Sequence, residues 1–148
     1  MSAPDRGRDD RLVEAAARYR GNAVSKRSGF SVGAAIEDAN GTIWGGCNVE
    51  NSTYGLTVCA ERVAIWKALS EGVRAFRAVA IVTGANEPTP PCGACRQILW
   101  EFCGDIDVTI ANLSGVVVFE VTIDDGTIPD EALRRVIANA VAQLHLEN

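Results

Sequence analysis

The chain has 148 residues, of which 47% are hydrophobic and 22% are charged, proportions typical of one globular domain rather than of a disordered or fibrous protein. Its 14 basic and 19 acidic side chains give a formal net charge of −5, which argues against nucleic acid as a partner. The apolar runs are too short to span a membrane and the first twenty residues contain no signal-peptide core, so we expect a cytoplasmic protein with no membrane partner.

The first third of the chain predicts one helix and one hairpin. Residues 1–9 mix charge with proline and glycine and are predicted to be a mobile tail, ahead of a single domain over residues 10–148. Apolar residues at helical spacing predict a helix over residues 10–21. Asn-Gly then separates two strand-like runs, FSVGAAIED and TIWGGCNVE, which is the strongest short signal for a β-hairpin. A turn-rich loop, NSTYGLT, follows.

The remainder of the chain alternates between helical and strand-like segments. Helices are predicted at residues 59–71 and 93–102, and strands at FRAVAIVTG, DVTIAN and VVVFEVT. The C-terminal stretch IPDEALRRVIANAVAQLHL predicts a long amphipathic helix, with acidic residues in its first turn. Five strands interleaved with helices indicate an α/β fold in which helices cover a mixed sheet.

Three of the five cysteines stand at predicted helix starts, and they suggest a metal site. In a reducing compartment cysteines indicate metal binding, redox chemistry or burial rather than a disulfide framework. A catalytic zinc ion takes three protein ligands and leaves a fourth position for water, and Cys59, Cys92 and Cys95 provide three. A thioredoxin-like C-x-x-C redox pair is an alternative, but it leaves Cys59 without a purpose.

A structural zinc site would need a fourth ligand, and the sequence offers no good one. Cys103 would lie about 12 Å along a continuous helix from Cys95. Cys47 is expected on the opposite face of its strand from its neighbour Asn48, because side chains alternate along a strand. His145 is more simply a surface or capping residue at the end of the terminal helix. Three ligands and a water molecule are therefore the preferred count.

The glutamate two residues after Cys59 is the expected proton carrier. Residues i and i+2 diverge along the flank of a helix but can converge beyond its end, so Cys59 and Glu61 place the metal off a helix N-terminus. The partial positive charge of such a terminus offsets the negative charge of the thiolates. Arg62 and Arg96 could add hydrogen bonds to the sulfurs. Taken alone, Glu61 would be an ordinary solvated carboxylate.

The segments NVENSTYGLTVCAERVAIWKALSEG and PCGACRQIL together resemble the small cytidine deaminases of the three-cysteine zinc type, and the resemblance runs over about residues 30–112. It implies a three-layer α-β-α sandwich with a five-stranded mixed sheet, and one Zn²⁺ per subunit bound by Cys59, Cys92 and Cys95. It also implies that zinc acidifies a water molecule and that Glu61 moves the proton to the ring and to the departing ammonia. The reaction would convert cytidine or deoxycytidine to uridine or deoxyuridine in pyrimidine salvage.

The same resemblance assigns a substrate pocket. Phe30 would pack against the pyrimidine, Asn48 and Glu50 would hydrogen-bond the ribose hydroxyls, and the N–H of Ala60 would donate to the pyrimidine carbonyl. Tyr54 belongs to a loop that family members lend to a neighbouring subunit, and the family is usually a homotetramer with shared pockets. Without the family, Phe30 would be a core aromatic and the two polar residues the end of a hairpin.

The sequence departs from the family pattern at two places, and these departures leave substrates other than cytidine as alternatives. Lys26 and Arg27 stand where many members have proline and tyrosine. The segment TIPDEALRRV offers Ala132 or Leu133 where members usually place an aromatic that reaches an adjacent active site. The alternatives are a deaminase of a modified or free nucleobase or of a blasticidin-like aminonucleoside and, less well supported, a non-catalytic zinc protein. A polynucleotide substrate is disfavoured by the acidic charge.

Overall fold

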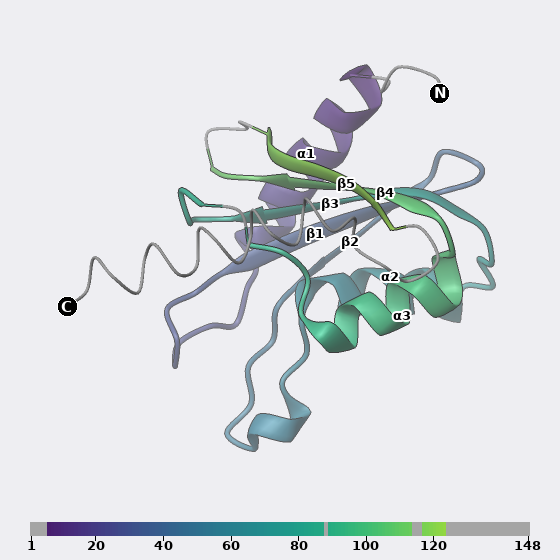
Figure 1. Cartoon of the computed structure of the whole chain (residues 1–148). Helices are drawn as coiled ribbons and strands as arrows, with labels where there is room; N and C mark the ends of the chain where they lie inside the picture. Colours follow the sequence, from purple (N-terminus) through teal and green to yellow (C-terminus); the bar gives the residue numbers. More distant parts are fainter. Residues whose placement is uncertain (1–5, 88, 114–116, 124–148) are drawn as a thin grey trace.

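The computed structural model describes residues 6–87, 89–113 and 117–123, which form a mixed sheet with helices on both of its faces (Figure 1). The strands are β1 (Val32–Asp38), β2 (Ile43–Cys47), β3 (Phe76–Thr83), β4 (Ile106–Ala111) and β5 (Val117–Ile123), in the spatial order β2-β1-β3-β4-β5. Strands β3 and β4 are parallel and the other neighbours are antiparallel. The predicted five-stranded mixed sheet is confirmed.

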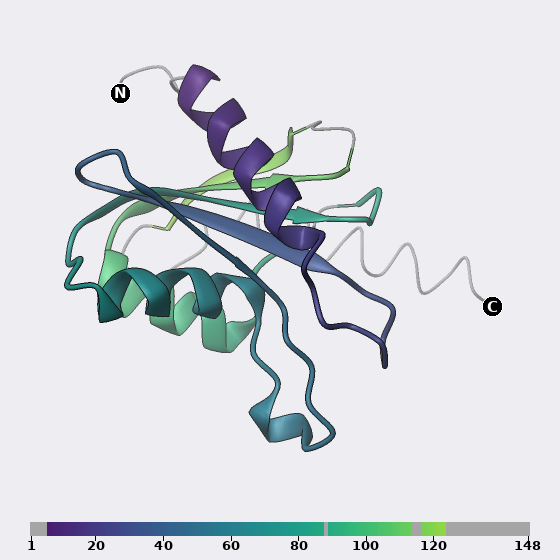
Figure 2. The same ribbon diagram turned by 180° about the vertical axis from the view of Figure 1, so that it is seen from behind.

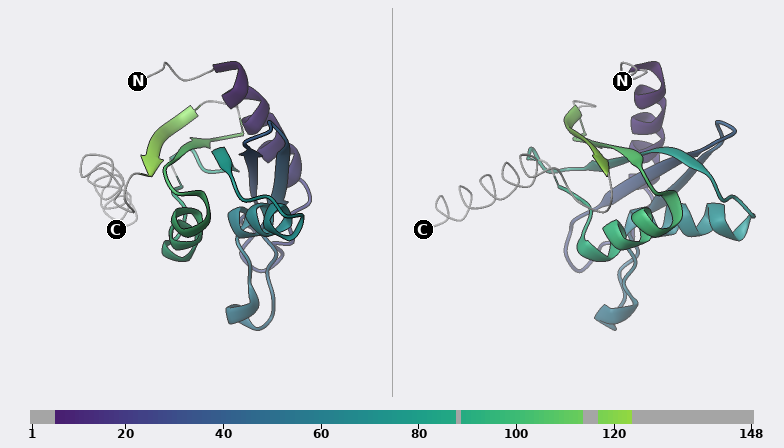
Figure 3. Two further views of the ribbon diagram at one scale, coloured as in Figure 1. Left: turned by 90° about the vertical axis from the view of Figure 1, so that its right-hand side faces the viewer. Right: turned by 45° about the vertical axis from the view of Figure 1, so that its right-hand side comes forward.

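The helices divide between the two faces of the sheet. Helix α1 (Arg6–Arg20) lies across one face, and α2 (Ala60–Ser70) and α3 (Gly93–Cys103) lie on the other (Figures 2 and 3). A short 3-10 helix, η1 (Tyr54–Leu56), sits on a loop that projects from the body of the molecule. Within the described residues, no helix is both long enough and apolar enough to cross a membrane.

Side-chain alternation along the central strands produces two hydrophobic cores. Ile36 and Ile81 belong to the core under α2 and α3. Their neighbours Ala35 and Val82 belong to the core under α1, where Leu12 is fully buried. A strand buried on both faces has apolar residues at successive positions, as the run AVAIV in β3 shows. The three-layer α-β-α sandwich expected from the resemblance is therefore confirmed.

Glycines in β2 allow helices to approach the sheet closely, and this contact positions the start of α2. A Cβ atom at Gly46 would lie 2.6 Å from the carbonyl oxygen of Ala60 and 2.6 Å from the amide nitrogen of Ala64. On the other face, a Cβ atom at Gly45 would overlap the ring of Tyr19 in α1. Only glycine fits at either position, so β2 holds the first turn of α2 at a fixed place on the sheet.

Two boundaries differ from the predicted ones. Helix α1 begins at Arg6, so residues 6–9, predicted as tail, form its first turn; charged residues are compatible with a helix start, and one early glycine costs only about 1 kcal/mol. The β1–β2 connection is four residues long instead of the Asn-Gly pair alone, because the carboxylate of Asp38 accepts the N–H groups of Asn40 and Thr42. Within it, Gly41 has φ 85°. The helices α2 and α3 begin within one residue of the prediction.

The predicted C-terminal helix, with Ala132, Leu133 and His145, lies outside the described residues.

Candidate metal centre and active site

The three predicted cysteine ligands meet where α2 and α3 begin. Cys59 and Cys92 are the residues immediately before α2 and α3, in extended backbone, and Cys95 lies in the first turn of α3. The Sγ atoms of Cys59 and Cys92 are 3.8 Å apart, and all three sulfurs lie within 4.8 Å of one another. Helix N-termini carry unpaired N–H groups and a partial positive charge, which stabilise thiolates placed there.

The spacing of the sulfurs suits a tetrahedral zinc ion. Zinc–sulfur bonds of about 2.3 Å require neighbouring sulfurs to lie about 3.8 Å apart, the separation found between Cys59 and Cys92. Cys47 and Cys103 do not join this group, and no histidine or carboxylate among the described residues does. The donor set therefore fits a zinc ion with three protein ligands, as the sequence predicted.

The thiols interact strongly with one another and with one arginine. Hydrogen bonding from Cys95 first, and then from Arg62 and Cys92, lowers the pKa of the Cys59 thiol to about 5. The pKa of Cys95 is raised, chiefly because its proton is held by the sulfur of Cys59. The guanidinium Nη2 of Arg62 lies 3.3 Å from Cys59 Sγ, and its carbon lies 5.9 Å from the ring centroid of Trp66. The lowered pKa of Cys59 favours its thiolate, the form of cysteine that binds a metal ion.

Arg96, the second predicted partner of the sulfurs, donates no hydrogen bond to them within the described residues. Arg62 therefore occupies the predicted position and Arg96 does not. Arg62 comes three residues after Cys59, one turn along the same helix face, and this spacing places its guanidinium at the sulfur.

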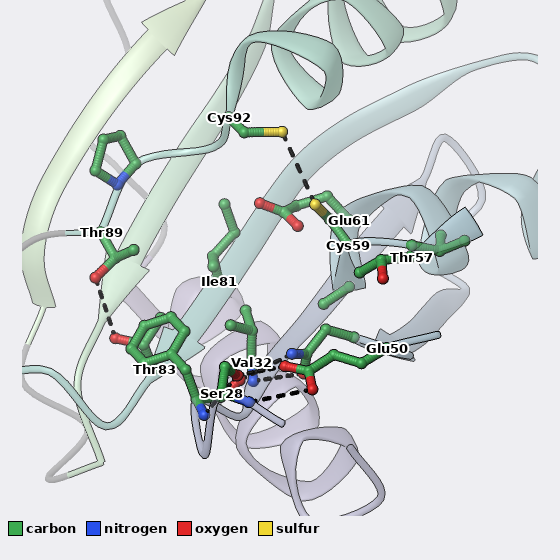
Figure 4. A pocket seen from close by; sticks show the side chains of 15 residues that line it. Ser28, Val32, Glu50, Thr57, Cys59, Glu61, Ile81, Thr83, Thr89 and Cys92 are labelled. Carbon is green, nitrogen blue, oxygen red and sulfur yellow. Dashed lines mark hydrogen bonds between the residues drawn. The ribbon is translucent and has the colours of Figure 1, made fainter. Parts of the chain in front are cut away.

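Glu61 lies beside the sulfurs without belonging to the cysteine group. It is only 6% exposed, in the first turn of α2. Burial raises the pKa of its carboxyl to about 7, and the negative charge of Cys59 acts in the same direction. Figure 4 shows its carboxylate oriented into the cavity next to Cys59. A carboxyl with these properties can both accept and donate a proton near neutral pH.

A cavity of about 300 Å³ connects the cysteines with the predicted substrate-binding residues. Cys59, Glu61 and Cys92 line one end, and Ser28 and Glu50 line the opposite end (Figure 4). Phe30 lines the cavity as well. Asn48 and Ala60 also line it. The cavity lies at the small end of the range for ligand pockets, the size expected for a metabolite.

Comparison with known proteins agrees with this geometry. The family model "Cytidine and deoxycytidylate deaminase zinc-binding region" matches residues 6–111. The chain belongs to the cytidine and deoxycytidylate deaminase family. A cytidine deaminase of Sporosarcina psychrophila is 48% identical over 107 residues, covering 72% of this chain and 79% of that protein. The crystal structure of cytidine deaminase from Burkholderia pseudomallei superposes with a TM-score of 0.75 at 41% identity, covering 81% of this chain and 95% of that one.

A relative that is named for another substrate is less similar to this chain. A blasticidin-S deaminase of Bacillus cereus is 32% identical over 87 residues, which covers 53% of this chain and 62% of that protein.

In this deaminase, Asn48 supports the pocket wall as well as lining it. Its Oδ1 accepts the N–H of Val32 at 2.8 Å, and its Nδ2 donates to the carbonyl oxygen of Phe30 at 2.8 Å. The amide therefore fixes the backbone on both sides of Ser31 and holds the Phe30 ring at the cavity, where that ring remains 39% exposed. Its direct contact with a sugar stays a prediction.

Glu50 is held in place by the turn that precedes Phe30. Its carboxylate accepts the N–H groups of Arg27 at 3.0 Å and Ser28 at 3.3 Å, and the Ser28 hydroxyl also donates to it. These bonds, the Ser28 hydroxyl first, lower the pKa of Glu50, so the carboxylate is ionised at neutral pH. A carboxylate accepts about four hydrogen bonds, so capacity for a ligand remains.

Tyr54 is the predicted site residue that lies apart from the others. It is 82% exposed on η1 and is not among the residues that line the cavity. The position agrees with a side chain that serves a neighbouring subunit, which stays a prediction.

Several residues that line the cavity were not predicted from the sequence. Ser28 and Thr57 belong to loops, and Thr83 ends β3; Thr89 and Pro90 lie in the loop that leads to α3. Thr83 carried a usable signal, because ligands bind at the carboxyl ends of parallel strands, and β3 is parallel to β4. The others carried none, since loop positions follow from tertiary packing.

Proposed function

We propose that this chain is a zinc-dependent hydrolytic deaminase that converts cytidine and 2′-deoxycytidine to uridine and 2′-deoxyuridine and releases ammonia. The observation that carries the proposal is the meeting of three cysteine sulfurs, all within 4.8 Å, beside a buried glutamate at the end of a cavity. The 48% identity to a protein named cytidine deaminase supports the same conclusion.

In this proposal, metal binding, proton transfer and binding of the pyrimidine carbonyl are carried out by different residues. Cys59, Cys92 and Cys95 would hold a zinc ion, which supplies a nucleophile at neutral pH by acidifying water. The carboxylate of Glu61 takes up the proton of the attacking water, delivers it to the ring nitrogen next to the amino group, and assists the departure of ammonia. The N–H of Ala60, at the first position of α2, has no acceptor within its helix and donates to the pyrimidine carbonyl.

The remaining residues orient the nucleoside. The ring of Phe30 packs on the pyrimidine, and the ionised carboxylate of Glu50 accepts a hydrogen bond from a ribose hydroxyl. Such a carboxylate would serve no purpose toward a free base, which is why a nucleoside is the preferred substrate over cytosine.

An ammonia-release assay across several substrates tests the proposal. Purified enzyme containing zinc is given cytidine, 2′-deoxycytidine, cytosine, guanine and blasticidin S. We expect turnover of the two nucleosides, with cytosine and guanine at least about a hundredfold slower, because the hydrogen bonds to the sugar are missing. Preferential turnover of blasticidin S would replace the proposal with the aminonucleoside alternative, for which the 32% identity to a blasticidin-S deaminase is the supporting observation.

We also propose a homotetramer of single-domain subunits in the cytoplasm, with pockets shared between subunits. The projecting η1 loop exposes Tyr54 by 82% and Leu56 by 63%, which is unusual for large apolar side chains and typical of an interface. Light scattering should give the mass of four chains, and Tyr54→Ala should lower activity at an unchanged zinc content.

A further inference from the structure

Two threonine hydroxyls face each other on a wall of the cavity that has no part in the chemistry described above. Thr83 is the last residue of β3 and is 1% exposed, and Thr89 lies in the loop between β3 and α3. Their Oγ1 atoms are 3.5 Å apart, and both residues line the cavity (Figure 4). The N–H of Ala85 donates to Thr83 Oγ1 at 3.2 Å.

The two threonine hydroxyls together have one proton available for a hydrogen bond to a ligand. Two hydroxyls bring two protons, and the bond between them uses one, whichever hydroxyl donates. Within the described residues, no further acceptor lies at hydrogen-bond distance from either hydroxyl. The pair therefore keeps one proton that can be donated into the cavity. Since this proton has no acceptor among the described residues, a polar atom placed there by a ligand can accept it and would be stabilised.

The orientation of the bound pyrimidine determines which edge of the ring faces this wall. That orientation is taken from the proposed function, so the inference rests on it. The carbon that bears the amino group faces the cysteines. The ring nitrogen and the carbonyl face Glu61 and Ala60, which both belong to the first turn of α2. In a six-membered ring the C5–C6 edge lies opposite the edge formed by N3 and C2. That edge must therefore point away from α2.

The wall across the cavity from α2 is formed by the end of β3 and the loop that follows it. Figure 4 shows Thr83 and Thr89 on this side, with the Glu61 carboxylate across the cavity from them. Pro90 completes the wall between Thr89 and the cysteines. The hydroxyl pair consequently lies next to C5 of the pyrimidine, the position at which natural cytosine derivatives carry substituents.

We propose that the Thr83–Thr89 hydroxyl pair recognises a polar substituent on C5, so that the enzyme prefers 5-(hydroxymethyl)cytidine to 5-methylcytidine. The reaction itself is unchanged: water supplies the oxygen at C4, the bond from C4 to the amino nitrogen breaks, and ammonia leaves. The substituent takes no part in this step and is carried into 5-(hydroxymethyl)uridine. The threonines act as specificity residues, because they contact the substrate without contacting the reacting atoms.

The test compares kcat/KM for the two derivatives and for cytidine in three proteins. In the wild type we expect the ratio of 5-(hydroxymethyl)cytidine to 5-methylcytidine to exceed about three. Thr89→Val keeps the shape of the side chain and removes its hydroxyl, and it should lower this ratio about fivefold, the effect of one net hydrogen bond. Thr89→Ser keeps the hydroxyl and should preserve the ratio.

A matched control removes a hydroxyl from the other side of the same cavity. Thr57→Val makes the same chemical change just before α2, away from the C5 edge, and it should leave the ratio of the two derivatives unchanged. A ratio in Thr89→Val equal to that of the wild type, with cytidine still deaminated, would overturn this inference and leave the proposed function standing. An absence of cytidine turnover in the wild type would overturn both.

Discussion

Cys59 and Cys92 are 33 positions apart in the sequence, yet their Sγ atoms lie 3.8 Å apart in the structure. Each directly precedes a helix, and the sheet determines where both helices begin. The start of α2 rests on Gly46 of β2, and α3 follows the loop at the end of β3. The metal site therefore requires the whole sandwich to be folded, because neither helix alone brings more than two of the sulfurs together.

Arg62 should stabilise the loaded site through its hydrogen bond to Cys59. Arg62→Gln removes the donor found 3.3 Å from the sulfur, and we expect zinc affinity to fall about 10- to 100-fold. Competition with a chromogenic chelator measures this affinity directly. Arg96→Gln is the matched control, since Arg96 donates no hydrogen bond to the sulfurs within the described residues. Equal losses in the two variants would contradict the role of Arg62.

Glu50 should contribute to binding of the sugar and not to binding of the base. We expect Glu50→Ala to raise the KM for cytidine about tenfold or more, because a charge-assisted hydrogen bond is lost. The KM for cytosine, which has no sugar, should change far less. Ser28→Ala should act in the same direction but more weakly, since the N–H groups of Arg27 and Ser28 still hold the carboxylate. A similar effect on both substrates would remove the ribose assignment.

Asp38 should make the fold sensitive to acid. The indole N–H of Trp44 first, and then the N–H groups of Thr42 and Asn40, lower the pKa of this buried carboxyl from its ordinary value. A carboxyl whose pKa is lower in the folded than in the unfolded protein adds to the free energy of unfolding. This contribution is complete above the unfolded-state pKa of about 3.9 and is lost as the pH falls through the folded-state pKa. Stability should therefore decline below about pH 4.

Urea unfolding at several pH values between neutrality and pH 3 measures this decline. Asp38→Asn should flatten it, because the titrating group is gone. Trp44→Phe should reduce it in part, since the backbone donors remain. A pH dependence identical in the wild type and in Asp38→Asn would show that other carboxyls dominate acid unfolding.

Gly46 should be intolerant of any side chain. In Gly46→Ala the new Cβ would lie 2.6 Å from backbone atoms of α2, and we expect a loss of about 1–3 kcal/mol, or a drop of several degrees in the melting temperature. The zinc content should fall as well, because α2 would be displaced together with Cys59. Gly55→Ala is the control, since a Cβ there meets open space. Equal melting temperatures for the two variants would contradict the argument.

The sequence predicted those parts of the site that depend on spacing along a helix. Three cysteines at two helix starts, with Glu61 two residues after the first of them, predicted the metal site and suggested the proposed proton carrier. Sequence reasoning did not find the partners of Glu50, because the turn at Arg27 and Ser28 reaches it only through the fold. The sequence shows Lys26 and Arg27 as a departure from the family, but the contact of Arg27 with Glu50 could not be derived from local pattern.

The fold was predicted more completely than the outline of the pocket. The pattern of apolar residues located the strands and helices because each element buries a defined face. In β3, for example, Ile81 belongs to the core on one side of the sheet and its neighbours Ala80 and Val82 to the core on the other. The pairing of Thr83 with Thr89 could not be predicted, since a threonine at a strand end and another in a proline-rich loop have no local reason to meet. Their proximity follows from how the loop returns to α3.

The most direct test of the account is the activity of Glu61→Gln measured together with its zinc content. Glutamine keeps the size and polarity of the side chain but cannot carry the proton. We predict one zinc per chain, as in the wild type, and a fall of about 10²- to 10⁴-fold in kcat for cytidine. Deamination at the wild-type rate by a zinc-loaded Glu61→Gln protein would contradict the proposed role of this residue and, with it, the assignment of the active site.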